Sequence, residues 1–299
     1  MRRGLTYAHL FLAVAALLWG ANSVASKLAV GEVSPMVITT LRWVIACSIL
    51  ALIARPQLRE DWPVLKPHWR SLALMGAVGI TVFNALFFIA GHYTSAINLG
   101  IAQGWISVLV FVGAYVVYGS PLGRIQLFGI LIALLGLVLV ACQGEPSRLL
   151  HLEVNVGDLM MLVGCAASAG YTLALHARPK VSSIGFFTVM AFVAALTSLP
   201  LLAIELAVGV LQWPTRTGWL ILVFIALGPS LLSQIFFVRG VAEIGPGRAG
   251  MFVNLVPVFG SIMAVVVIGE RFAVHQVIAL IMVAGGILIA ECAVPDKGR

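Results

Sequence analysis

The sequence predicts an all-α membrane protein of ten transmembrane helices, arranged as two inverted five-helix repeats around a central cavity. Three observations lead to this fold class: the composition, the number of apolar runs and an internal repeat. Of the 299 residues, 61% are hydrophobic and only 10% are charged, and the mean hydropathy is +1.08. A soluble domain is closer to half apolar and a quarter charged, so the composition indicates a polytopic membrane protein.

Ten apolar runs follow one another along the chain, each about 20 residues long, which is the length that crosses a hydrocarbon core. They cover 9–30, 35–54, 70–91, 95–118, 123–142, 156–178, 182–207, 216–240, 245–268 and 272–292. Because the connections are short, only 55–69 and 143–155 are expected to form loops of any size. The first run is expected to be a retained span rather than a secretory signal, since Lys27 interrupts it and no small-residue cleavage site follows.

The formal charge of +7 is distributed as a membrane topology requires. With the N-terminus in the cytoplasm, thirteen of the 18 Lys and Arg residues fall on the cytoplasmic side, which is the positive-inside bias. Ten spans then place both termini in the cytoplasm. Topology accounts for the basic charge, so we expect a lipid bilayer around the chain and no nucleic-acid partner.

An internal repeat relates the two halves at an offset of about 150 residues, without gaps. The offset pairs Gly119 with Gly269, Gln126 with Gln276, Gly136 with Gly286, Trp69 with Trp219, and the amides Asn84 and Gln234. The sequence therefore predicts one five-helix repeat over 1–145 and a second over 146–299. Because five is an odd number of spans, the second repeat enters the membrane from the opposite face. Inverted repeats are typical of transporters that alternate access to a site at the midplane.

Polar residues interrupt most spans on one helical face. In the first span, Trp19, Asn22 and Ser26 share a face because residues three, four and seven apart lie together on a helix. The other candidates are Asn84 and His92 in or at the end of span three, Gln103 and Trp105 in span four, Ser168 and Tyr171 in span six, Gln234 in span eight and Asn254 in span nine. Interhelical hydrogen bonding would also account for such residues. Spans five and ten are almost wholly aliphatic, which predicts a packed layer behind a hydrated cavity.

Charged residues are scarce inside the spans. Arg42 lies well within span two, where it either bridges helices structurally, snorkels to the interface or binds a substrate carboxylate. The acidic residues all lie in loops or near span ends, Asp158, Glu205, Glu270 and Glu291 coming closest to the interior. We therefore expect a neutral or zwitterionic substrate and no proton coupling through a buried carboxylate. Pro229 and Pro257 predict breaks in spans eight and nine.

Signatures of enzymes are absent from the sequence. It contains no HExxH, GxSxG or P-loop motif, and its four cysteines all fall within predicted spans without metal-ligand spacing. We expect no catalytic residue, no bound metal and no cofactor. An intramembrane enzyme is the least favoured function.

Several stretches resemble the ten-span EamA-type members of the drug/metabolite transporter superfamily. They are "LLWGANSVASKLAV", "SPMVITTLRWVIA", "GPGRAGMFVNLVPVFGSIMAVVVIGERF" and the glycine-rich final span. The resemblance covers nearly the whole chain. It implies two inverted five-helix repeats and export of small metabolites across the cytoplasmic (inner) membrane of a bacterium, with both ends in the cytoplasm.

Within that superfamily the chain looks most similar to bacterial amino-acid exporters, including those for aromatic amino acids. The resemblance carries a cavity role over to Asn84, Gln103, Trp105, Ser168 and Tyr171. Asn84, Gln103 and Ser168 stand where aromatic residues are typical, which favours a broader range of amino acids.

The sequence thus predicts a secondary transporter that exports amino acids or similar small neutral metabolites by alternating access. We expect it to act as a monomer with a small-molecule substrate. The alternative is an organic-anion or sugar-phosphate antiporter, which would need Arg42, Lys27 or Arg239 in the cavity.

Overall fold

The computed structural model describes residues 2–119, 122–145, 155–244, 249 and 252–292. All regular structure within these ranges is helical, which confirms the all-α prediction. Nine helical stretches of the described chain are long and apolar enough to cross a membrane, and Leu255–Ile268 is a shorter apolar helix. The start of the predicted ninth span, around 245–251, lies mostly outside the described residues.

The helices follow the predicted order. Their bounds are α1 Arg2–Leu28, α2 Pro35–Ile53, α3 Arg55–Leu65, α4 Trp69–Leu74, α5 Phe83–Ala90, α6 Ala96–Ala102, α7 Gly104–Tyr118, α8 Arg124–Ala141, α10 Val156–Ala174, α11 Ser183–Ala207, α12 Arg216–Ile225, α13 Ser233–Ile244, α15 Leu255–Ile268 and α16 Val274–Cys292. Short 3-10 turns cover Lys66–His68 and Leu175–Ala177.

The prediction of a loop over 55–69 is wrong, because this segment is helical. It forms α3 and the 3-10 turn Lys66–His68, and then continues into α4. Leu58 and Leu65, seven residues apart, place their side chains on the core formed with α2 and α11. A narrow stripe of buried apolar residues is enough to stabilise a surface helix whose other faces are charged. Because the stripe is narrow, the mean hydropathy of the segment stays below that of a membrane span.

Two segments of π-helix occur at equivalent positions of the two repeats. η2 covers Met75–Val82 between α4 and α5, and η4 covers Ala226–Leu232 between α12 and α13. The 150-residue offset maps one onto the other. Pro229 lies inside η4, where the wider turn accommodates a residue that cannot donate a backbone hydrogen bond. The break predicted at Pro229 is therefore present. The break predicted at Pro257 is also present, because the helix is interrupted at Asn254. Pro257 then lies in the first turn of α15, where no backbone donor is needed.

The helices α8 and α16 show how the repeats are related. Each begins with the same cap: Gln126 Oε1 accepts from the backbone N–H of Gly123, and Gln276 Oε1 accepts from that of Ala273, both at 3.0 Å. Gly119 and Gly269, the residues that end the preceding helices, both have left-handed backbone, with φ of 62° and 70°. The repeat found in the sequence thus extends to the backbone conformation.

Contacts between α8 and α16 show that the repeats are inverted. Gly129 packs on the backbone of Gly286, and Gly136 packs on the backbone at Ala279. Residue numbers increase along α8 in the direction in which they decrease along α16, so the two helices are antiparallel. The 150-residue offset converts the pair Gly129 and Gly286 into the pair Gly136 and Ala279. This is expected of inverted repeats that are related by a two-fold axis.

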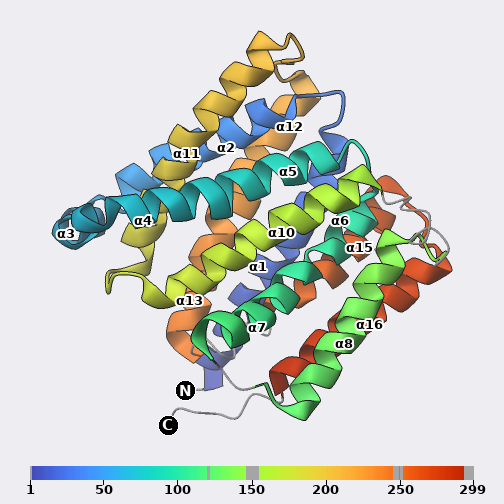
Figure 1. Ribbon diagram of the computed structural model, residues 1–299. Helices are drawn as coiled ribbons and strands as arrows, with labels where there is room; N and C mark the ends of the chain where they lie inside the picture. Colours follow the sequence, from blue (N-terminus) through green and yellow to red (C-terminus); the bar gives the residue numbers. More distant parts are fainter. Residues whose placement is uncertain (1, 120–121, 146–154, 245–248, 250–251, 293–299) are drawn as a thin grey trace.

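The helices form a central group flanked by two pairs. Figure 1 shows α8 beside α16 on one side and α2 beside α11 on the other, with α1 and α10 between them. The central helix α1 packs on α13 and α15 of the second half, and its counterpart α10 packs on α5 and α7 of the first half. Side chains of both halves therefore meet along α1 and α10.

One end of the molecule, which we call the Lys27 end, joins the halves by several hydrogen bonds. At this end, which includes the α5–α6 turn (91–95), Lys27 Nζ donates to the carbonyl oxygens of Gly91 (3.1 Å) and Thr94 (2.9 Å). Asn155 Nδ2, which precedes α10, donates to the carbonyl of Tyr93 at 2.9 Å. Glu270 accepts from the backbone N–H groups of Ala96 and Ile97 at 2.9 and 3.0 Å. Both halves thus hold this turn and the start of α6.

The α1–α2 loop is tied to the second half at the same end. Ser34 Oγ donates to Glu205 Oε2 at 2.6 Å, and Gln212 Nε2 donates to the carbonyl of Gly31 at 2.7 Å. At the opposite end, Asp61 of α3 accepts from the backbone N–H of Ser182 at 3.2 Å. Hydrogen bonds therefore join the α2 and α11 pair at both of its ends.

Candidate functional site

A buried arginine lies where the two halves meet. Arg42 of α2 is 4% exposed. Its Nε donates to Ser230 Oγ at 2.9 Å, and its Nη1 donates to Asn84 Oδ1 at 2.7 Å. Asn84 belongs to the first half and Ser230 to the second, so one guanidinium bridges the two repeats. Within the part of the chain that the structure describes, no carboxylate pairs with it.

The two π-helices position both partners of Arg42. Asn84 follows η2 by two residues and donates through Nδ2 to the carbonyl of Ile80 at 2.7 Å. Ser230 lies within η4 and donates to the carbonyl of Ile225, five residues back, at 2.7 Å. Both side chains therefore use their donors on the backbone and present oxygen to Arg42. We call Arg42, Asn84 and Ser230 the arginine network.

Aromatic groups surround the arginine network. The Arg42 guanidinium carbon lies 5.2 Å from the centre of the Trp43 ring and 5.4 Å from that of Phe88, distances at which cation–π attraction operates. Tyr171 of α10 packs directly on Gly79 in η2 and contacts the core cluster that contains Trp43. The structure thus brings three predicted site residues, Arg42, Asn84 and Tyr171, to the same region of the fold.

A second polar group lies along α1. Ser23 accepts a hydrogen bond from Gln103 Nε2 at 3.1 Å, and Gln103 stands at the break between α6 and α7. Asn22 is 8% exposed, and its Oδ1 has no hydrogen-bond partner. Trp19 packs against Phe237 of α13, with ring centres 5.3 Å apart. These three predicted residues, Trp19, Asn22 and Gln103, therefore face other helices rather than lipid alone.

Three glycines let the helices of this second group approach closely. Gly260 of α15 packs on the backbone of Gly20 of α1 and on that of Gly100 of α6, so a Cβ at Gly20 would lie 2.6 Å from the Gly260 nitrogen. This packing places the polar face of α1 against the opposite repeat, as small residues do in membrane helices.

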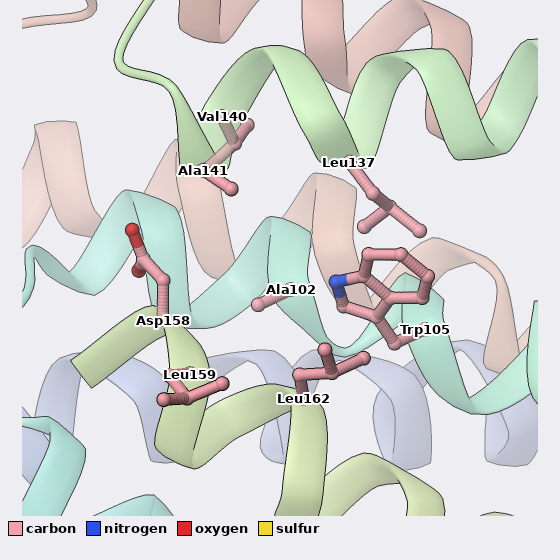
Figure 2. A pocket seen from close by; sticks show the side chains of 8 residues that line it. All are labelled: Ala102, Trp105, Leu137, Val140, Ala141, Asp158, Leu159 and Leu162. Atoms are coloured by element: carbon pink, nitrogen blue, oxygen red, sulfur yellow. The ribbon is translucent and has the colours of Figure 1, made fainter. Parts of the chain in front are cut away.

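Trp105 lines a small cavity between α7, α8 and α10. Figure 2 shows its indole between Leu137 and Leu162, with Asp158 at the other end of the cavity. The cavity has a volume of about 60 Å³. Its lining is apolar apart from the indole N–H and the carboxylate.

The remaining predicted residues have separate surroundings. Asn254 Nδ2 donates to Glu291 Oε2 of α16 at 2.7 Å, and its Oδ1 accepts from Ser107 at 3.4 Å. Ser168 and Gln234 are half-buried in α10 and α13. His92 is exposed in the α5–α6 turn. Its pKa is lowered from 6.5, mainly by partial burial and further by the Lys27 ammonium group, against a small opposing effect of Glu205.

Two features of the interior go beyond the predicted site residues. Ser230, one of the polar residues of span eight, directly follows Pro229 in the repeat position of Ile80, and the proline break was a signal for a side chain turned inward. Asp158 and Glu205 lie near helix ends, where the sequence places them, but they are 7% and 8% exposed, and the sequence did not predict this burial.

The arrangement suits ligand binding rather than covalent chemistry. A guanidinium held by two neutral oxygen acceptors keeps its positive charge uncompensated, and such a group binds carboxylates strongly where water is scarce. The hydrogen bonds to Asn84 and Ser230 fix its position at the boundary of the two halves. A carboxylate bound there would contact both repeats.

Comparisons with known proteins agree with this picture. The profile of the EamA-like transporter family matches residues 6–142 and again residues 155–291. An uncharacterized transporter of Bacillus subtilis, YyaM, is 28% identical over 91% of this chain and 89% of its own length. Another transporter of the same organism, YetK, is 24% identical over 94% of this chain and 86% of its own.

A solved crystal structure shares the fold, with a TM-score of 0.64 and 21% identity over 95% of this chain and 96% of that one. The double match of the family profile agrees with the two repeats described above. The chain is a multi-pass membrane transporter and belongs to the EamA-like transporter family.

Proposed function

We propose that the protein exports amino acids or similar small metabolites that carry a carboxylate, by alternating access across the cytoplasmic membrane. The observation that carries the proposal is Arg42, a buried cation that joins both halves and has no acidic partner among the described residues. Leaving a charge buried without a counter-ion is costly. A substrate carboxylate would supply that counter-ion at the interface of the repeats.

The surroundings of Arg42 suggest how such a substrate is held. Its carboxylate takes the place of one neutral acceptor, Asn84 or Ser230, on the guanidinium. The released Asn84 Oδ1 becomes available to accept a hydrogen bond from the substrate ammonium group. Tyr171 and Trp43, which lie in the adjoining cluster, offer apolar surface for the side chain.

The proposal includes the predicted organisation of the chain. The repeats extend over 1–145 and 146–299, both termini lie in the cytoplasm, and the Lys27 end faces outward. The protein acts as a monomer and needs no cofactor. The transporter names of its relatives agree with a role without catalysis.

The second candidate is an organic-anion antiporter, and the same arginine favours it. Arg42 supplies a positive site, whereas the arginine network contains no carboxylate that would pair with a substrate ammonium group. The two functions differ in whether the substrate amine contributes to affinity.

Counterflow in proteoliposomes distinguishes the two. Vesicles preloaded with one unlabelled amino acid take up labelled compounds from a three-part panel: the amino acid, its carboxamide and its des-amino acid. Amino-acid transport predicts accumulation of the first compound only. Accumulation of the des-amino acid at the same rate supports the anion antiporter, and accumulation of the carboxamide overturns the role of Arg42.

Variants of two arginines test whether Arg42 belongs to the substrate-binding site. Arg42→Lys keeps the charge but loses the planar fork, so we expect affinity for the transported compound to fall at least tenfold. Arg239→Gln is the matched control, because Arg239 is exposed on α13, and it should retain counterflow. Equal losses in the two variants, with the proteins intact by size-exclusion chromatography, would remove Arg42 from the site.

A further inference from the structure

Asp158 is a buried acid at the Lys27 end with half of its carboxylate unpartnered. It lies in the first turn of α10 and is 7% exposed. Its Oδ1 accepts from Thr94 Oγ1 of the α5–α6 turn at 2.9 Å. Its Oδ2 is buried and has no hydrogen-bond partner.

Two other acids at this end, Glu270 and Glu205, use both carboxylate oxygens as acceptors. Glu270 uses one oxygen for the N–H of Ala96 and the other for that of Ile97. Glu205 accepts from Ser34 Oγ at 2.6 Å and from the backbone N–H of Met36 at 3.2 Å. Among the described residues, Asp158 alone has a carboxylate oxygen that is both buried and unpartnered.

The unpartnered carboxylate borders the cavity shown in Figure 2. The side chain projects from α10 toward the end of α8, and Val140, Ala141 and Leu159 form the neighbouring walls. None of these side chains donates a hydrogen bond. Because Oδ2 has essentially no exposed surface, bulk solvent does not hydrate it while this end is closed.

The position of Asp158 links it to the closure of the molecule. Thr94 donates to Asp158 through its hydroxyl and accepts from Lys27 through its carbonyl. The hydrogen bond from Thr94 to Asp158 crosses from the first half to the second. Opening of the Lys27 end between the α5–α6 turn and the start of α10 would break it and admit water to the carboxylate.

We propose that Asp158 is a proton-binding site of the transport cycle, occupied while the Lys27 end is closed and emptied when that end opens. This inference rests on the alternating access proposed above. In the closed state the neutral acid avoids the cost of a buried, half-satisfied charge. On opening, the O–H bond breaks, the proton passes to external water, and the hydrated carboxylate remains on α10.

Other titratable groups lie on the elements around Asp158 and could contribute to a pH dependence. Lys27 lies beyond Thr94 on α1, and His92 and Tyr93 precede Thr94 in the turn. Cys142 and Glu145 follow α8, and Cys165 lies further along α10. From α6 and α7 the neighbours are Ala102 and Trp105, neither of which titrates. His92 is the group most in need of a control, because its range lies near neutral pH.

The experiment measures closure against pH, without substrate. Spin labels are attached to cysteines at Tyr93 and Val156, which are 55% and 53% exposed on the two sides of the contact, after replacement of the four free cysteines. Dipolar broadening in lipid nanodiscs reports whether the two sites are close. Because the closed state holds one more proton, the ratio of open to closed molecules should rise with pH, by up to about tenfold per pH unit in the range where the closed state is protonated and the open state is not.

Variants test which residue causes the pH dependence of the open-to-closed ratio, which we call the slope. Asp158→Asn should remove it, with Asp158→Ser as the second variant if the first does not fold. Glu270→Gln and His92→Gln should keep it, because both oxygens of Glu270 accept backbone hydrogen bonds in the closed state and His92 is exposed. A slope that survives in Asp158→Asn, or no slope in the parent protein, overturns the proposal.

The result is independent of the substrate. If the counterflow panel shows no transport but the pH slope is present and requires Asp158, the proton site stands and the proposed substrate class falls. If counterflow succeeds and the slope is absent, transport stands and the proton site falls.

Discussion

At the scale of single residues, the sequence could locate Arg42 but not its partners. A cation within an apolar run is costly, and this reasoning marked Arg42 as a bridging, snorkelling or substrate-binding residue without deciding between the three. Its hydrogen bond to Ser230 spans 188 positions of the chain, and no local pattern encodes such a pairing. The sequence likewise pointed to Asn84 and Tyr171 as interior residues, while their meeting beside η2 depends on helix packing.

A methyl group at Gly79 should disturb this meeting. In Gly79→Ala the new Cβ would overlap the Cβ of Tyr171, so α10 must move away from η2. We expect transport to slow several-fold with lower apparent affinity, as measured by counterflow. Gly170→Ala is the control, because nothing lies within 4 Å of a Cβ there, and equal effects in both variants would contradict the role given to Tyr171.

His92 gives a prediction about pH. Partial burial and the nearby Lys27 ammonium lower the pKa of its imidazole from 6.5. The ring is therefore neutral at pH 7 and above and gains its charge only below its ordinary range. His92→Gln should leave the pH profile of counterflow unchanged between pH 6.5 and pH 8, and a shifted profile in that interval would show that His92 titrates there.

At the scale of helices, the sequence predicted the ten spans and missed two helical segments, η2 and α3. Hydropathy detects any long apolar run, so the spans agree closely with the helices. It does not detect η2, whose sequence, MGAVGITV, contains no proline, and it missed α3, which buries only a narrow stripe. Both depend on what packs against the segment, Tyr171 on η2 and α11 on α3.

Two adjacent glycines of α16 allow a matched test of helix packing. A Cβ at Gly286 would lie 2.5 Å from the carbonyl oxygen of Gly129, whereas a Cβ at Gly285 meets nothing within 4 Å. Gly286→Leu should therefore separate α8 from α16 and cost about 1–3 kcal/mol or more through overpacking. The measurement is the apparent Tm in detergent, which should fall by several degrees for Gly286→Leu and hardly change for Gly285→Leu.

Gly129→Leu provides the check from the other repeat. The contact between Gly129 and Gly286 is mutual, so both variants should lower the Tm by similar amounts. Equal melting of the Gly285 and Gly286 variants would instead show that close approach of α8 and α16 adds little to stability.

At the scale of the whole molecule, the inverted repeat was the most informative feature of the sequence. A gapless offset and an odd number of spans predicted the two-fold relation that the caps of α8 and α16 and the two π-helices display. The sequence did not reveal that hydrogen bonds join the halves at the Lys27 end, because those bonds connect loops of different repeats. We expect alternating access to act at these hydrogen bonds.

A reversible cross-link at this end tests that central claim most directly. In a background without native cysteines, Tyr93→Cys and Gly157→Cys face each other across the halves, since a Cβ at Gly157 would lie 3.0 Å from that of Tyr93. Slight relaxation brings the pair to the spacing of a disulfide. Oxidation should hold the Lys27 end closed.

The measurement is counterflow by the oxidised and the reduced forms of this one protein. We predict that oxidation abolishes counterflow while substrate still binds from the opposite side, and that reduction restores transport. Undiminished counterflow by the fully cross-linked protein would contradict alternating access through the Lys27 end.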